Sequence, residues 1–385
     1  MGKEKLNILF LCSWYPNPDS EPNGIFNKRH AQALALKHHV TVLFVKSIHS
    51  ESEKHIHLKE KNFEEILFFY PKSQSNIPII KSVLNFFKFK KEYKTQIDLL
   101  KTNFDVIHLN VIFPAAIPAL YALKKFPKAK LFITEHWSGY YPEDGNYKGL
   151  MIKYFTKKIL KKAKMVFVVS EKLRVTMQQH KLLNRYRLIN NVVDENIFKP
   201  LEIKTPSHKL RILHVSSLVD KEKNISGIIK IAEGLKQKNI QFELKIVGGN
   251  DIEIEKYKKL AYKNLSESEV NFTGNQDSKM IAKFMNESDV FLLFSNYEGM
   301  PVVLIEAMAC GLPVITTNVG HVEKMIKPKM GIILNSNSVE ECVEKLMSFK
   351  RSSFLNAKEM HQETIKNYGY QSVCDILTEY YIKEL

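Results

Sequence analysis

The stretch that decides the fold is residues 296–311, with the sequence NYEGMPVVLIEAMACG. It follows the apolar run Asp289–Phe294, which predicts a buried parallel strand. Pro301 suits the first turn of a helix, because its φ is already helical and its missing N–H needs no partner there. Gly311 and Pro313 predict the end of that helix. The stretch is therefore expected at the edge of an α/β sheet where ligands bind.

Two carboxylates stand eight positions apart in this stretch, Glu298 in the loop and Glu306 in the second helical turn. The helix is apolar nearly all round, so the Glu306 carboxylate needs a partner that its neighbours in the sequence do not supply. The two hydroxyls of a nucleotide ribose would satisfy it. The N–H groups of Met300, Val302 and Val303 would receive phosphate or sugar oxygens at the helix start. Alternatively, Glu298 is solvated and Glu306 pairs with a distant Lys or Arg.

Length and composition predict an ordinary globular protein of two domains. The chain has 385 residues, of which 44% are hydrophobic and 25% charged. Its four cysteines form no CxxC pair, which indicates reduced thiols. No signal peptide is apparent before Leu6, and no apolar run has the ~18 residues that a membrane span needs. We therefore expect a cytoplasmic protein.

The net charge of +16 is concentrated in two lysine-rich segments, 81–101 and 148–164. Both interleave lysines with aromatic and aliphatic residues, as in basic amphipathic helices that bind anionic membrane surfaces. A solvated lysine-rich face is the alternative. Nucleic acid is not an expected partner, because zinc-ligand spacing, RNA-binding aromatic signatures and a helix-turn-helix are all missing.

The first half begins with a strand-loop-helix-strand unit. Leu6–Cys12 predicts a strand, Ser13–Gly24 a long loop, Ile25–Lys37 a helix and Val40–Val45 the next strand. No G-x-G-x-x-G opens the helix, which disfavours NAD. Gly24 would let the backbone approach a phosphate, or it forms an ordinary turn.

Histidines mark the carboxyl ends of two further strands, Asp105–Leu109 and Leu131–Thr134. His136 follows the second strand and could donate a hydrogen bond to a sugar hydroxyl or a phosphate, or transfer a proton near neutral pH. His108 is a second candidate. Met165–Ser170 predicts the last strand of this half.

A connector, Asn190–Pro200, and a polar linker, Lys204–Lys209, precede a second alternation of strands and helices. The predicted strands there are Arg211–Val215, Phe242–Val247, Val270–Thr273, Asp289–Phe294, Val314–Thr317 and Ile332–Leu334. Lys223 follows the first of them and could meet a diphosphate. Gly248 and Gly274 follow the next two, at the edge that holds the two carboxylates.

This pattern resembles the retaining glycosyltransferases of the GT-B fold, family 4 (glycosyl transferases group 1). The residues that match the family's Glu-x7-Glu signature are Glu298, Gly299, Pro301, Glu306, Ala307, Gly311, Pro313, Val314 and Gly320. The resemblance implies an α/β fold with two Rossmann-like β/α/β domains facing a central cleft. Residues 1–195 would bind the acceptor, 196–365 would bind the nucleotide-sugar, and the C-terminal helix in 366–385 would pack back on the first domain.

The resemblance also implies roles. Glu306 would hold the ribose and Glu298 the transferred sugar, and Lys223 would neutralise the diphosphate. His136 matches a histidine at the active-site base, so His136 and Glu298 are the expected catalytic pair. The backbone of Gly299, Met300, Pro301, Val302 and Val303 would bind sugar and phosphates, with Gly24, Gly248 and Gly274 as further donor-binding positions.

The sequence departs from the family at two places. Ser216 and Ser217 stand where the family has Gly-Arg, and Asn224 stands where it has Gly. Loss of the arginine would remove a bidentate phosphate clamp. No Asp-x-Asp motif occurs, which agrees with a metal-independent, cofactor-free reaction.

The expected reaction moves a sugar from a UDP- or GDP-sugar to a hydroxyl of a lipid-linked or cell-surface polysaccharide, such as lipopolysaccharide or capsule. It would take place in the cytoplasm, at the inner face of the cell membrane. Two alternatives remain open: a sugar-nucleotide epimerase on the same fold, and a non-catalytic sugar-nucleotide-binding partner of another transferase.

Overall fold

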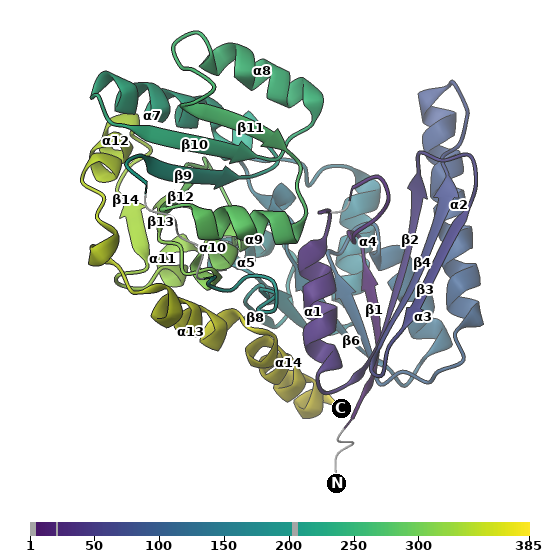
Figure 1. The fold of residues 1–385 in the computed structure, drawn as a ribbon. Helices are drawn as coiled ribbons and strands as arrows, with labels where there is room; N and C mark the ends of the chain where they lie inside the picture. Colours follow the sequence, from purple (N-terminus) through teal and green to yellow (C-terminus); the bar gives the residue numbers. More distant parts are fainter. Residues whose placement is uncertain (1–4, 21, 202–206) are drawn as a thin grey trace. The chain divides into compact units, whose positions relative to one another are not determined.

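The computed structural model describes residues 5–20, 22–201 and 207–385. The chain forms two compact units. Unit 1 contains the residues up to Val192 together with Tyr370–Leu385, and unit 2 is Val193–Gly369. Figure 1 draws unit 1 in purple to teal with a terminal yellow helix, and unit 2 in teal to yellow. Of the predicted linker, residues 204–206 lie outside the described residues.

Unit 1 is built on an eight-stranded sheet with the order β3-β4-β2-β1-β5-β6-β7-β8. Its strands are β1 (Asn7–Cys12), β2 (His39–Ile48), β3 (Lys54–Lys59), β4 (Phe63–Pro71), β5 (Val106–Asn110), β6 (Lys130–Glu135), β7 (Ala163–Val168) and β8 (Tyr186–Leu188). Neighbouring strands are parallel except for β3, which runs antiparallel to β4. The central strands are continuous apolar runs because both faces of the sheet are covered.

Helices of unit 1 connect these strands. They are α1 (Ile25–Ala35), α2 (Pro78–Leu99), α3 (Ala116–Lys125), α4 (Leu150–Leu160), α5 (Glu171–Gln179) and α14 (Tyr370–Glu384), with a short 3₁₀ turn η1 (Ser138–Tyr140). Helix α3 contacts both α2 and α4, and α1 packs against α14 (Figure 1).

Unit 2 has a six-stranded parallel sheet with the order β11-β10-β9-β12-β13-β14. The strands are β9 (Leu210–Val215), β10 (Phe242–Val247), β11 (Val270–Gly274), β12 (Val290–Leu293), β13 (Val314–Thr317) and β14 (Gly331–Leu334). The helices are α6 (Asp220–Lys223), α7 (Ile225–Gln237), α8 (Asp251–Ala261), α9 (Ser278–Glu287), α10 (Val302–Ala309), α11 (Val322–Met325), α12 (Val339–Met347) and α13 (Ala357–Tyr368), with a 3₁₀ turn η2 (Arg351–Ser353).

The predicted strands are confirmed, with ends that differ by at most a few residues. Strands β3, β4 and β8 were not predicted from the sequence, and the prediction that Met165–Ser170 is the last strand of the first half is wrong, because β8 follows it. Strand β3 lies at the sheet edge with nearly every residue exposed, so it has no apolar face to detect. Strand β8 has only three residues.

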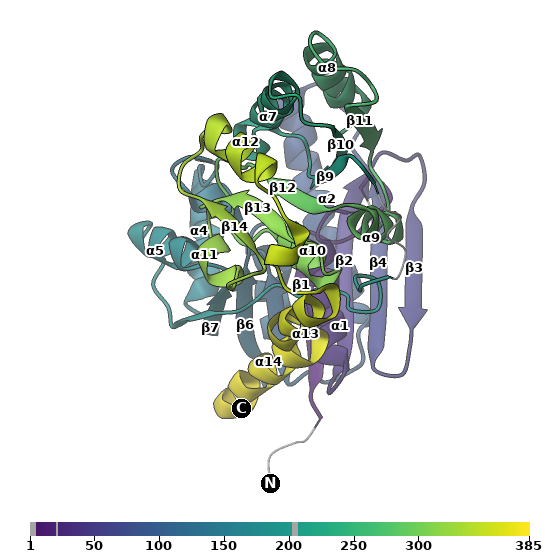
Figure 2. The ribbon, with the colours of Figure 1, turned by 60° about the vertical axis from the view of Figure 1, so that its left-hand side comes forward.

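The last helix of the chain completes unit 1, as Figure 2 shows in yellow beside α1. Tyr381 of α14 is fully buried and its hydroxyl is hydrogen-bonded to the ring of His108. The other ring nitrogen of His108 is 2.7 Å from the Thr134 hydroxyl. The predicted return of the C-terminal helix to the first domain is confirmed, and His108 is a core residue that ties this helix to the sheet.

The four cysteines are all free and buried, as predicted. None of the described helices combines the length and the hydropathy that crossing a bilayer requires.

Candidate active site

The predicted strand-loop-helix element lies at the carboxyl edge of the sheet in unit 2. Pro301 is the N-cap residue of α10, one position before the first turn in which it was predicted, and the helix ends at Ala309 with Cys310 as its C-cap. Gly311 has φ 73°, and a Cβ there would lie 2.5 Å from Cα of Ala357. Only glycine meets both conditions without strain. Glu306 is buried in the second turn of α10.

Glu298 is held by two donors. The hydroxyl of Ser295 and the ammonium of Lys223 each donate to Oε1 of Glu298 at 2.8 Å. Lys223 also lies 2.7 Å from a carboxylate oxygen of Glu222. Burial lowers the pKa of Lys223, but the charges of Glu298 and Glu222 outweigh it and raise the pKa overall. Two predicted site residues, Lys223 and Glu298, are thus in direct contact.

The backbone around Glu298 is shaped by Gly320. A Cβ on Gly320 would lie 2.4 Å from the carbonyl oxygen of Glu298, and Gly320 has φ 64°. The N–H of His321 donates to the carbonyl of Gly299 at 3.0 Å. The first N–H groups of α10, on Val302 and Val303, have no acceptor within the helix because they belong to its first turn.

The loop after β9 shows what Ser216 and Ser217 do at the positions where the family has Gly-Arg. The hydroxyl of Ser216 accepts from the N–H of Leu218 at 3.1 Å and is bonded to Nε2 of His214 at 2.8 Å. Ser217 is exposed. Ser216 therefore braces the loop, whereas Ser217 supplies no cation where the family has arginine.

The need for glycine at positions 248 and 274 has a structural explanation that involves no ligand. A Cβ on Gly248 would lie 1.8 Å from the carbonyl oxygen of Ser216, and its N–H donates to the carbonyl of Gly274 at 2.8 Å. Their φ values are 112° and 69°. Both shape the loops at this edge, and their predicted contact with a donor stays a prediction.

Asn224 stands where the family has glycine, and it adopts a left-handed conformation. Its φ is 53°, and its side chain caps α7 by accepting from the N–H of Gly227 at 3.1 Å. Asparagine tolerates the left-handed region better than other residues that have a Cβ, because its short polar side chain bonds locally. This departure is therefore conservative.

His136 lies at the carboxyl edge of the sheet in unit 1. Its ring centre is 4.5 Å from that of Phe26 and 5.3 Å from that of His30. Burial, then the nearby His30 and His108, lower its pKa well below the usual value, and a side-chain hydrogen bond to Asn191 only partly opposes this. The imidazole is neutral at pH 7. Its Nε2 is buried without a hydrogen-bond partner among the described residues.

Glu135, which was not among the predicted site residues, fixes the backbone that carries His136. Its carboxylate accepts from the N–H groups of Ile112, His136 and Trp137 at 2.9–3.0 Å and from the hydroxyl of Tyr140 at 3.0 Å. Burial raises the pKa of Glu135, and these hydrogen bonds oppose the rise. The sequence did contain one sign of this role, a charged residue at the end of an apolar strand.

Asn110 was also missed. It ends β5, is fully buried, and neither atom of its amide has a partner among the described residues. Strands β5 and β6 are parallel neighbours, so Asn110 and His136 lie at the same edge of the sheet. Polar atoms left unpaired in this way are uncommon in native proteins and call for a water or a ligand.

Gly24 has a structural explanation in unit 1. It has φ 74°, and a Cβ there would lie 2.4 Å from the carbonyl carbon of Trp14. Asn27, one turn into α1, donates to the carbonyl oxygen of Trp14 at 2.7 Å. Gly24 thus lets the first loop pack on α1, and its role toward a phosphate stays a prediction.

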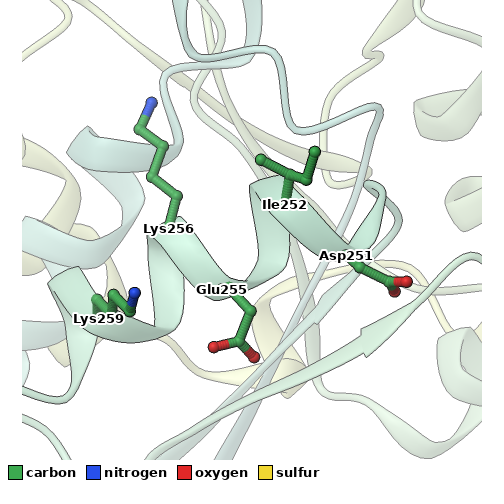
Figure 3. A pocket seen from close by; sticks show the side chains of 5 residues that line it. All are labelled: Asp251, Ile252, Glu255, Lys256 and Lys259. Atoms are coloured by element: carbon green, nitrogen blue, oxygen red, sulfur yellow. The ribbon is translucent and has the colours of Figure 1, made fainter.

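One face of α8 in unit 2 lines an open hollow, as Figure 3 shows. The side chains are Asp251, Ile252, Glu255, Lys256 and Lys259. None of them is a predicted site residue. Within the described part of the chain, no three His, Cys, Asp or Glu side chains are grouped to hold a metal ion. Metal independence remains a prediction from the sequence.

Comparison with known proteins places this chain in a family. Residues 194–371 match the model of glycosyl transferases group 1, and residues 25–197 match that of glycosyltransferase family 4. A curated relative, the putative colanic acid biosynthesis glycosyltransferase WcaL of Escherichia coli, is 29% identical over 166 residues, which are 41% of this chain and 40% of that protein.

Solved structures share the fold over the whole chain. Sucrose-phosphate synthase from Thermosynechococcus elongatus has a TM-score of 0.77 at 20% identity, covering 98% of this chain and 99% of that one. HepE from Anabaena, in complex with UDP and glucose, has a TM-score of 0.66 at 15% identity, covering 99% and 100%. Since both family models describe glycosyltransferases and together span residues 25–371, the chain belongs to the GT-B glycosyltransferases of group 1 and family 4.

Proposed function

We propose that this protein is a retaining glycosyltransferase that moves a sugar from a UDP- or GDP-sugar to a hydroxyl of a lipid-linked or cell-surface polysaccharide acceptor. The observation that supports it most is the element around α10. Glu298 pairs there with Lys223, Glu306 is buried in the second turn of α10, and the first N–H groups of α10 have no acceptor within the helix.

The chemistry of this element suits a nucleotide-sugar. Lys223 can exchange Glu298 for a diphosphate, because an ammonium binds either anion as a point charge. The Glu298 carboxylate then accepts from sugar hydroxyls, and Glu306 accepts from the ribose diol. The start of α10 adds N–H donors and the positive end of its dipole. Ser217 in place of arginine leaves the diphosphate with fewer cations than in the family.

The unpaired Asn110 amide and the Nε2 of His136 support an acceptor role for unit 1. A hydroxyl group both donates and accepts hydrogen bonds, so a sugar acceptor could satisfy these atoms. A neutral His136 can accept the proton of an attacking hydroxyl. HepE binds UDP and glucose, and WcaL is named for polysaccharide biosynthesis, which supports the same classes of donor and acceptor here.

Thermal denaturation with added nucleotides tests the donor site. We expect UDP or GDP to stabilise the wild type, by roughly 2.7 kcal/mol at 100 times the dissociation constant. Glu306→Gln should lose most of this shift. Glu323→Gln, an exposed carboxylate in the same unit, should keep it. No shift with any nucleotide would contradict the proposal.

Turnover separates the catalytic proposal from its alternatives. Wild-type protein with a UDP- or GDP-sugar and a membrane lipid extract should release the nucleotide only when acceptor is present, with the sugar's anomeric configuration retained. Donor converted without acceptor would instead favour an epimerase. Nucleotide binding without any turnover would favour the non-catalytic partner, which Ser217 makes the more plausible alternative.

A further inference from the structure

The first half of α2 exposes an apolar stripe. Ile79, Val83 and Phe87 follow one another at four-residue spacing, and their exposed fractions are 77%, 48% and 61%. Ile80 and Leu84 lie beside them and are also exposed. Such a stripe normally faces a core. Here the buried residues of α2, Tyr93, Gln96 and Ile97, all belong to its second half.

The start of α4 has the same character. Leu150 is 88% exposed, and Met151 and Tyr154 are about half exposed. The buried residues of α4 are Thr156, Ile159 and Leu160, in its second half. Two helices of unit 1 therefore begin with large apolar side chains in water, although each is anchored by its other end.

Charge around both helix starts has a single sign. Residues 78–91 contain four lysines and no acidic residue, and residues 147–164 contain seven lysines and no acidic residue. The lysines of α4 at 153, 157 and 158 are exposed. Long lysine stems lie along apolar surface and keep their ammonium groups in the polar layer, as at a membrane interface.

Topology puts the two helix starts at one edge of unit 1. Helix α2 follows β4 and α4 follows β6, both strands run parallel to β1, and α3 contacts both helices. That edge also carries the loop with Trp14 and the residue His136. The apolar and basic surface thus adjoins the loops assigned to the acceptor.

We propose that the starts of α2 and α4 dock unit 1 on an anionic lipid bilayer. The docking surface consists of Ile79, Val83, Phe87, Leu150, Met151 and Tyr154, with the lysines around them. Apolar side chains enter the boundary between headgroups and acyl chains, while the lysines attract anionic lipids. Docking in this orientation brings a lipid-linked acceptor to the loops of unit 1; this last point rests on the function proposed above.

Vesicle sedimentation tests the docking without any sugar substrate. The full-length protein should sediment with vesicles of phosphatidylglycerol and phosphatidylcholine and stay in solution with phosphatidylcholine alone. Because a lysine near an anionic surface contributes about fivefold in partitioning, reversing four lysines should lower it at least about a hundredfold. The variant is Lys81→Glu, Lys91→Glu, Lys153→Glu and Lys157→Glu.

Two further variants complete the test. Ile79→Ser with Phe87→Ser and Leu150→Ser removes apolar side chains without changing charge, and should weaken sedimentation at physiological salt. Lys230→Glu, Lys263→Glu, Lys324→Glu and Lys358→Glu makes the same charge change on exposed positions of unit 2 and should leave sedimentation unchanged.

The proposal would be overturned if the wild-type protein did not sediment with anionic vesicles, or if it bound nucleic acid but not vesicles. It would also be overturned if the unit 2 control lost as much vesicle binding as the unit 1 variant. Because exposed side chains are replaced, we expect every variant to keep the wild-type melting temperature. Nucleotide stabilisation of each variant reports the donor site separately, so failure of docking and failure of the proposed function are distinguishable.

Discussion

At the scale of single residues, the contact between Lys223 and Glu298 links stability to ligand binding. Their side chains are 15% and 8% exposed, so each charge depends on the other for solvation. Under the function proposed above, a donor diphosphate competes with Glu298 for this ammonium. The pair then holds the Lys223 cation in place before the donor binds, at a cost in donor affinity.

Replacing Lys223 with methionine should destabilise unit 2 by about 3 kcal/mol, since it leaves the buried Glu298 carboxylate without its cation. The double variant Lys223→Met, Glu298→Leu should recover part of that loss. Urea unfolding of both variants and of Glu298→Leu alone gives the double-mutant cycle. Additive effects of the two single changes would mean that the pair is not coupled.

Two buried histidines predict how stability depends on pH. Burial, first among the causes, lowers the pKa of His108 to about 3 and that of His214 to about 4. The unfolded chain titrates near 6.5, so below that pH it binds more protons than the folded chain. Stability should be constant above about pH 7 and fall by up to about 1.4 kcal/mol per pH unit for each histidine between pH 6.5 and 4.

Thermal unfolding between pH 4.5 and 8 measures this slope. His214→Gln should lower the stability at pH 7 but make the acid side of the curve shallower. A variant curve parallel to that of the wild type would show that His214 does not take part.

At the scale of elements, the end of α10 makes a prediction about Gly311. Gly311→Ala combines a left-handed φ, which costs about 1–2 kcal/mol, with a Cβ 2.5 Å from Cα of Ala357. Gly274→Ala is the control in the same unit, because its φ is 69° and the added Cβ would meet only a side-chain carbon of Ile254, at an ordinary 3.5 Å. We expect Gly311→Ala to lower the melting temperature clearly more than Gly274→Ala. Equal shifts in melting temperature would mean that the left-handed backbone alone causes the loss of stability and that the contact with Ala357 adds nothing.

Elements of this fold were predictable wherever burial leaves a pattern. The strands of unit 2 and the helix from Pro301 to Gly311 follow from apolar runs and helix-end signals. Strand β3 carries no such pattern because it is exposed, and its partner β4 begins with Phe63, Glu64 and Glu65. The local sequence therefore did not predict these two strands.

The site was predictable only in part, for a similar reason. Glu298 and Lys223 stand out in their own loops, but nothing in the sequence shows that they touch across 75 positions. Asn110 becomes notable only when its burial and its unmet hydrogen bonds are known, whereas Glu135 could have been noticed as a charged residue that ends an apolar strand. Contacts between distant segments decide such roles, and a single sequence does not contain them.

At the scale of the whole molecule, α14 contributes to the core of unit 1 although it is the last element of the chain. Tyr381→Ala should destabilise unit 1 by about 3–5 kcal/mol, because it empties a fully buried aromatic site and leaves Nδ1 of His108 without its partner. Ile382→Ala, at the next and half-exposed position, is the control and should cost little. Calorimetry that resolves the two units should show only the transition of unit 1 shifting; an equal shift of both transitions would contradict this.

The position of α14 also has a consequence for biosynthesis. A chain growing on the ribosome presents the strands of unit 1 first, then all of unit 2, and only at the end the helix that covers His108 and the neighbouring core. Unit 2 can fold as one continuous segment, whereas unit 1 waits for residues 370–385, which follow unit 2 in the chain. A nascent chain or a truncated product without them would contain a finished unit 2 and an incomplete unit 1, and the uncovered apolar surface of unit 1 would expose it to chaperones and proteases.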